Sequence, residues 1–171
     1  MTIRIASLTK GGIAALLMAV TPEGTRADDR LDFEVTGAVV ASCGLADQRI
    51  RIDLGSVAYG DLGRVGAASP WRRAAFSGVD CVGATRAAVT LRARPYPPDP
   101  RLLQPEGTAR GVAIEMRTGA GESIVPDGKT PVGFSWPGGA PQLAFEARYV
   151  RTGDVGAGDA TATAVVEITW E

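Results

Sequence analysis

Cys43 and Cys81 are the two cysteines of the chain, and its 171 residues include no histidine. Without histidine, Ser-His-Asp and Cys-His catalysis, nearly all zinc chemistry and the usual pH switch are excluded. Carboxylate pairs could still hydrolyse a glycosidic bond, but the acidic residues fall mostly at alternate strand positions or in Gly/Pro turns, as on a solvated surface. The sequence therefore contains no set of catalytic residues that would support an exported hydrolase. We predict no enzyme, no cofactor and no metal site.

The first 27 residues have the pattern of a secretory signal peptide. Arg4 and Lys10 give a positive start, and residues 11–20 form an apolar stretch too short to span a bilayer. The alternative, a buried N-terminal helix, is stopped by Thr21-Pro22. We expect residues 1–27 to be removed.

The mature chain would be close to neutral. The whole chain has 18 basic and 19 acidic side chains, and cleavage removes three basic residues and one acidic residue. The mature chain then keeps 15 basic and 18 acidic side chains, so its formal charge is −3. This balance gives no reason to expect a nucleic acid partner. No second apolar segment approaches membrane length, so we predict no stable membrane insertion.

In an exported protein, two distant cysteines are typical of a structural disulfide. A bond between Cys43 and Cys81 would restrict the unfolded chain by about 4 kcal/mol in the chain-entropy model. The alternative is a pair of free, buried thiols.

Apolar residues alternate with polar ones along most of the chain after residue 30, which predicts β-strands. The clearest run is 157–171, and similar runs occur at 31–41, 49–57, 87–93, 111–118 and 142–150. Turn formers separate these runs, and we interpret the proline cluster at 95–100 as a crossing loop within one domain. Short strands at such spacing predict an all-β sandwich.

Six stretches together resemble the type 1 fimbrial subunits, or pilins, of chaperone–usher pili: VTGAVVASC, IDLGSV, FSGVDC, LLQPEGTARGVAIEMRTGAGESI, LAFEARYV and VGAGDATATAVVEITWE. The resemblance covers nearly the whole mature chain. It implies an incomplete immunoglobulin-like β-sandwich with Greek-key connections that lacks its last strand. A periplasmic chaperone lends such subunits a strand before assembly at an outer-membrane usher. In the fibre, the N-terminal extension of a neighbouring pilin subunit replaces it.

The resemblance also assigns roles to individual residues. Cys43 and Cys81 match the two cysteines of the family. The donor strand would carry Leu31, Phe33, Val35 and Gly37. The strand that borders the groove and meets the chaperone would carry Gly158, Ala160, Ala162, Ala164, Val166, Ile168 and Trp170. Trp170 replaces the usual penultimate tyrosine and keeps its flat apolar body but not its hydroxyl.

These matches predict three parts: a signal peptide at 1–27, a donor-strand extension at 28–37 and a pilin domain at 38–171. The expected function is that of a structural subunit of a bacterial surface fimbria, exported through the periplasm, polymerised by donor-strand exchange and supporting cell adhesion. The alternative is a monomeric secreted β-sandwich that binds a carbohydrate or surface ligand, with residues 31–35 paired inside their own domain.

Overall fold

The computed structural model describes residues 33–171. The expected signal peptide and Leu31 lie outside the described residues. The chain divides into one unit that ends at Gly37 and a second unit, Ala38–Glu171. In the first, Phe33 and Val35 have exposed fractions of 87% and 82%.

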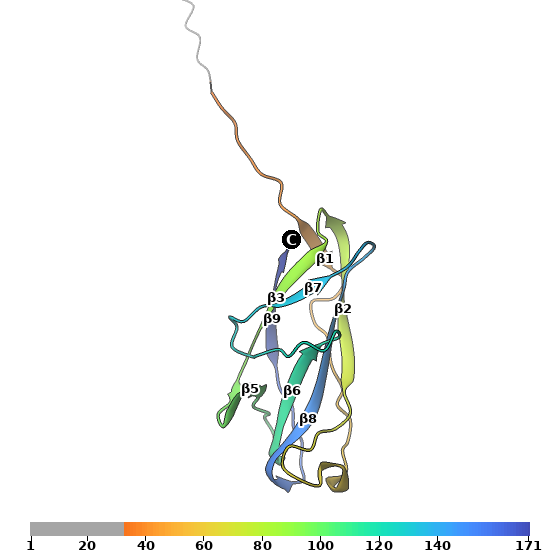
Figure 1. The fold of residues 1–171 in the computed structure, drawn as a ribbon, viewed down its shortest axis with the longest axis vertical. Helices are drawn as coiled ribbons and strands as arrows, with labels where there is room; N and C mark the ends of the chain where they lie inside the picture. Colours follow the sequence, from red (N-terminus) through yellow and green to blue (C-terminus); the bar gives the residue numbers. More distant parts are fainter. Residues whose placement is uncertain (1–32) are drawn as a thin grey trace, which may run out of the picture. The chain divides into compact units, whose positions relative to one another are not determined.

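Residues 38–171 form a sandwich of two antiparallel sheets (Figure 1). One sheet has six strands in the order β1-β2-β8-β6-β5-β4, and the other has three in the order β7-β3-β9. The bounds are β1 Ser42–Leu45, β2 Arg72–Val82, β3 Arg86–Ala93, β4 Pro95–Tyr96, β5 Asp99–Leu103, β6 Arg110–Thr118, β7 Val132–Ser135, β8 Gln142–Gly156 and β9 Ala164–Trp170. The predicted all-β sandwich is confirmed.

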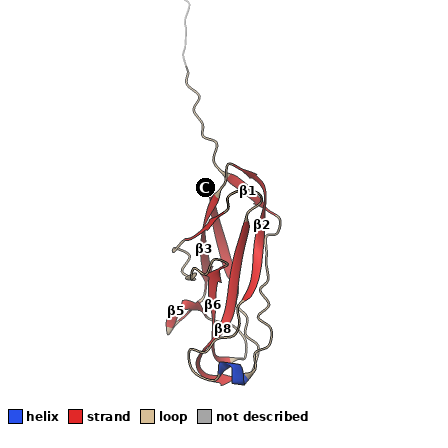
Figure 2. Ribbon diagram, turned by 45° about the vertical axis from the view of Figure 1, so that its right-hand side comes forward, coloured by secondary structure: helices blue, strands red, loops and turns tan. Residues whose placement is uncertain are grey.

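Strands account for nearly all regular structure in residues 33–171, as Figure 2 shows. The exception is a 3₁₀ turn, η1, at Tyr59–Leu62. No helix in this part of the chain has the length and apolar character needed to cross a bilayer.

The core lies between the two sheets and follows the alternation of the sequence. On β8, Leu143, Phe145 and Ala147 are buried, and on β3 Val89 and Leu91 are fully covered. The ring of Phe145 lies 6.1 Å from that of Phe76 and 5.4 Å from that of Phe134. Such tilted and edge-on aromatic contacts stabilise a core beyond the area they bury. Phe145 is therefore central to the packing of the two sheets.

Trp71 anchors a polar cluster on the opposite, outer face of the six-stranded sheet. The guanidinium groups of Arg117 and Arg148 lie 4.0 and 4.2 Å from its ring centroid. Arg117 donates to Glu146 at 2.6 Å, and Arg148 donates to Glu115 at 2.7 Å. Cation–π contacts and cross-strand ion pairs thus hold β6 and β8 in register on this face.

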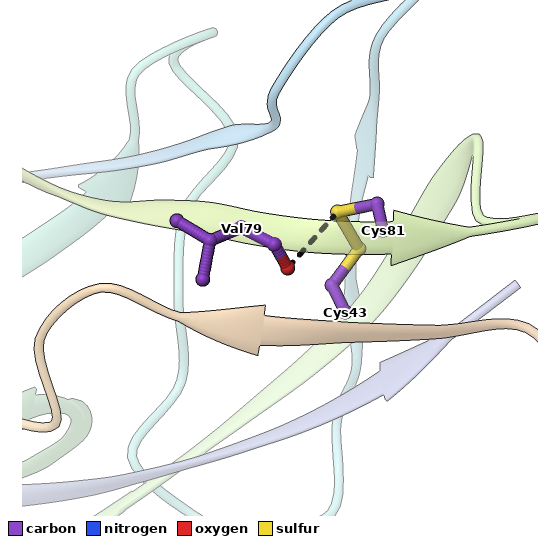
Figure 3. Close-up of a disulfide and its surroundings, with 3 residues drawn as sticks. All are labelled: Cys43, Val79 and Cys81. Atoms are coloured by element: carbon purple, nitrogen blue, oxygen red, sulfur yellow. Dashed lines mark hydrogen bonds between the residues drawn. A yellow bond between two sulfur atoms is a disulfide. The ribbon is translucent and has the colours of Figure 1, made fainter.

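The disulfide between Cys43 and Cys81 closes a sequence separation of 38 residues and joins β1 to β2. Figure 3 shows the bond bridging the two strands, with the Val79 carbonyl oxygen 3.8 Å from Cys81 Sγ. The predicted pairing is present, and the alternative of free thiols is wrong because the described chain has no free cysteine.

Two predicted strands are not strands in this structure. Residues 33–41 and 49–57 make no ladder, because a strand needs a neighbour and neither segment has one among the described residues. The expected start of the final strand is also wrong. Residues 160–163 contribute only a bridge from Thr161 to Glu106, and the continuous strand begins at Ala164.

The proline cluster also differs from its prediction as a crossing loop. Pro95–Tyr96 and Asp99–Leu103 pair as a short hairpin, β4–β5, at the edge of the larger sheet. Pro97 and Pro98 form its turn, where fixed φ angles favour a tight reversal. Strand β7 was not predicted, because its four residues carry too few alternations between flanking Gly and Pro.

Candidate functional site

Residues 38–171 contain an apolar groove of about 960 Å³. It lies between two segments far apart in sequence, residues 45–55 and residues 160–168. Its floor comes from both sheets and consists of Phe76, Leu91, Leu103, Ile114, Met116, Phe145, Ala147 and Tyr149. The groove therefore opens directly onto the hydrophobic core.

Strand β9 forms one wall. It pairs with β3 from Ala93↔Ala164 to Ala87↔Trp170 and is the edge strand of its sheet. The segment 160–168 lines the groove, and alternate residues of it pack against the core: Ala162, Ala164, Val166 and Ile168. The other edge of β9 meets no strand in the described part of the chain, so its backbone groups face the groove unpaired.

Residues 48–55 form the opposite wall. Ile50, Ile52 and Leu54 pack against the core, while Arg49 and Arg51 between them are exposed. This is the spacing of an extended strand. Just before this wall, the Ala46 amide donates to the Ser77 carbonyl at 2.9 Å, but residues 47–55 join no sheet within 33–171. Both walls thus have strand-like edges without a strand between them.

One end of the groove is fixed by Tyr149. Its hydroxyl donates to the Ala160 carbonyl at 2.9 Å. Burial raises the pKa of Tyr149, and the carboxylates of Asp53 and Asp159 add to the shift, so the hydroxyl stays protonated as a donor. This bond holds the start of the β9 wall in place before the strand itself begins.

Gly158 lies just before that point, against Thr108 and Ala109. A Cβ at position 158 would lie 2.5 Å from the amide nitrogen of Ala109. The Ala109 amide donates to the Asp159 carbonyl at 3.1 Å, and the Asp159 amide donates to Thr108 Oγ1 at 3.2 Å. Only glycine allows the backbone to approach this closely.

The other end of β9 is ordered through its final residue. Trp170 meets Trp136 edge-on, with ring centroids 6.0 Å apart. The carbonyl of Glu171 accepts from the amides of Thr85 and Arg86 at 2.8 and 3.0 Å, and its own amide donates to Arg86 at 2.8 Å. These bonds explain how a strand at the end of the sequence avoids fraying.

The shape of the groove fits an extended peptide. Residues 160–168 extend over about 26 Å at roughly 3.3 Å per residue. The surface is apolar in its floor and offers backbone donors and acceptors along both walls. An added β-strand satisfies both, because its backbone pairs with an edge while alternate side chains enter the floor.

Sequence reasoning located part of this site. The wall at 160–168 contains predicted residues, and Trp170 lies at its end beside Trp136. The roles of these residues in donor or chaperone binding stay predictions. The opposite wall was missed as part of a site, although the alternation of Ile50, Ile52 and Leu54 was recognised. The floor was missed because its residues come from both sheets.

Comparison with known proteins identifies the family. The family model described as fimbrial protein matches residues 31–171. The chain belongs to the fimbrial protein family. This fimbrial subunit is 31% identical over 163 residues to Protein LpfE of Salmonella typhimurium, a match that covers 92% of this chain and 91% of LpfE.

Solved structures support the same assignment. The fimbrial subunit matches the CupB6 tip adhesin of Pseudomonas aeruginosa with 29% identity and a TM-score of 0.65, over 74% of this chain but only 38% of that one. It matches the P pilus rod subunit PapA with a TM-score of 0.63 and 20% identity, over 75% and 99% of the two chains. A type I fimbria protein of Burkholderia pseudomallei gives 25% identity and a TM-score of 0.55, over 76% and 99%.

These findings confirm several predictions. The subunit belongs to cell-surface pili of the chaperone–usher type, which are exported through the periplasm, and its relatives assemble with other subunits. Its fold is that of the immunoglobulin-like pilins. The family is structural rather than enzymatic, as expected from the lack of a catalytic set.

Proposed function

We propose that the fimbrial subunit polymerises by donor-strand exchange, with its apolar groove as the acceptor site. The observation that supports this most directly is the groove itself, about 960 Å³ in volume and bordered by the free edge of β9. An exposed apolar edge invites aggregation, so the groove must be occupied during export and in the fibre. A periplasmic chaperone fills it first, and an outer-membrane usher then passes the subunit to its neighbour.

The donor is the N-terminal extension, residues 28–37, freed when the signal peptide 1–27 is removed. Leu31, Phe33 and Val35 are its groove-facing residues, and Gly37 is the glycine within the donor strand, just before the pilin domain, 38–171. Two of these side chains, Phe33 and Val35, are large, apolar and exposed. Burying such a side chain contributes about 1.5–3 kcal/mol. The resulting fibre supports cell adhesion without any cofactor.

The proposal is tested by giving the subunit its own donor. Residues 28–37 are deleted from the front of the mature chain, and DDRLDFEVTG is appended after Glu171 through a short flexible linker. We expect a soluble monomer that unfolds at a clearly higher urea concentration than a control with the same ten residues scrambled. Since β9 ends at Trp170, the linker lets the segment fold back antiparallel to it. Equal stability of the two proteins would contradict the proposal and favour a complete, monomeric binding module.

The alanines of the β9 wall leave room for bulky donor side chains. Ala162 lines the groove and packs against the core cluster. We expect Ala162→Trp to weaken donor binding by tenfold or more, because overfilling a packed site costs about 1–3 kcal/mol. Polymer yield on gels run without heating measures the effect, and Thr169→Trp, at an exposed position of β9 that does not line the groove, is the control. Normal polymers from Ala162→Trp would exclude this role for the alanines.

A further inference from the structure

The 48–55 wall of the groove, together with Asp47 just before it, carries an ordered row of charges on its exposed side. Asp47, Arg49, Arg51 and Asp53 occupy every second position and are all exposed. Their signs are negative, positive, positive, negative. None of the four forms an ion pair with another residue in the range 33–171. The charges are therefore available to a strand placed beside them.

The extension of the same chain carries the complementary row. If Leu31, Phe33 and Val35 face the groove, the alternate residues Arg30, Asp32 and Glu34 face outward, because successive side chains of a strand point to opposite faces. Their signs are positive, negative, negative. The spacing of two residues is the same as on the groove wall.

The two rows match in either strand direction. Parallel to the wall, Arg30 pairs with Asp47, Asp32 with Arg49 and Glu34 with Arg51. In the opposite direction the partners become Asp53, Arg51 and Arg49. A parallel strand slipped by two residues places Arg30 beside Arg49 and Glu34 beside Asp53, both like-charge contacts, which are unfavourable between neighbouring strands.

Strand β9, on the other side, adds little charge selection. The exposed residues of β9 and of the segment just before it are Thr161, Thr163, Val165, Glu167 and Thr169. Glu167 is already compensated by Arg92, whose Nη2 lies 2.9 Å from its Oε1. The charges that an incoming strand meets without an ion-pair partner are thus those of the 47–53 row, in which Asp53 Oδ1 also accepts a hydrogen bond from the Gly55 amide at 2.9 Å.

We propose that the groove selects the extension of a second copy of this chain and fixes its register through this charge ladder. The inference rests on the proposed donor-strand function. The apolar pattern alone cannot set the register, since a slip of two residues still places apolar side chains in the groove. Matched charges penalise the slipped register and strands with other charges. The extension of one copy therefore fits the groove of another copy, and the subunit can extend a homopolymer.

A charge-reversal cycle tests this in the monomer that carries its own appended donor. The donor is reversed by Arg30→Asp, Asp32→Arg and Glu34→Arg, and the wall by Asp47→Arg, Arg49→Glu, Arg51→Glu and Asp53→Arg. Four proteins combine native and reversed rows, and the rate of strand release in urea is followed by tryptophan fluorescence. At 20 mM salt we expect each mismatched protein to release its strand at least fivefold faster than the native one. The doubly reversed protein should recover the native rate.

Salt provides the second readout. At 0.5 M salt the Debye length falls to a few ångströms, so the difference between matched and mismatched proteins should shrink to below twofold. Suppose that all four proteins release their strands at equal rates while the native donor still raises the urea concentration of unfolding above that of the scrambled donor. That result would overturn the charge ladder and leave donor-strand exchange intact. If the native donor gives no more stability than the scrambled one, both proposals are overturned.

Discussion

Deleting residues 28–36 is expected to abolish polymerisation and leave the folded body as stable as before. The deletion removes the donor side chains Leu31, Phe33 and Val35, whose burial in a neighbour would contribute about 5–9 kcal/mol together. Sheared surface fibres and unheated gels report polymerisation. Stability is measured by urea unfolding of the body with the donor appended after Glu171, with and without residues 28–36.

The matched control replaces residues 28–36 with nine Gly and Ser residues, which keeps the length and removes the apolar pattern. It should behave like the deletion. A loss of several kcal/mol in the free energy of unfolding of the body would mean that the segment is a strand of its own domain. That result would support the monomeric binding module instead.

Truncation of Phe145 is expected to lower the free energy of unfolding by about 3–5 kcal/mol, the usual cost of removing a buried aromatic side chain. Phe145 is 1% exposed, lies between Phe76 and Phe134, and forms part of the groove floor. Urea unfolding of Phe145→Ala with the donor appended measures this. Val65→Ala, at a position 64% exposed, should change stability by less than about 0.5 kcal/mol. A cost below 1 kcal/mol for Phe145→Ala would show that the two sheets do not depend on this contact.

The sequence predicted the paired strands whose apolar residues alternate clearly, but it missed β2, which pairs with both β1 and β8. Val89 and Leu91 on β3, and Leu143 and Phe145 on β8, alternate and are buried as expected. Periodicity failed at 49–57 because it reports which face of a segment is apolar and not whether a strand lies beside it. Ile50 and Ile52 therefore have the spacing of a strand without a ladder.

The groove itself could be predicted only in part. Its β9 wall has a period of two and a family resemblance, but its floor gathers Phe76, Leu91 and Phe145 from different strands. Contacts between residues so distant in sequence depend on how the sheets stack, which no local pattern encodes. The resemblance singled out Gly158, and the close approach of its backbone to Ala109 is visible only in three dimensions.

The disulfide has a mechanical consequence for a fibre under tension. In a fibre joined by donor-strand exchange, as proposed, a pull on the extension would enter the body through β1, which leads into the 48–55 wall. Without a covalent link, that pull would peel β1 from β2 and then tear open the wall that grips the neighbour. The bond from Cys43 to Cys81 diverts the force into β2, which is paired with β8 in the middle of the larger sheet. The wall would then transmit tension through the whole larger sheet rather than being peeled open from its β1 end.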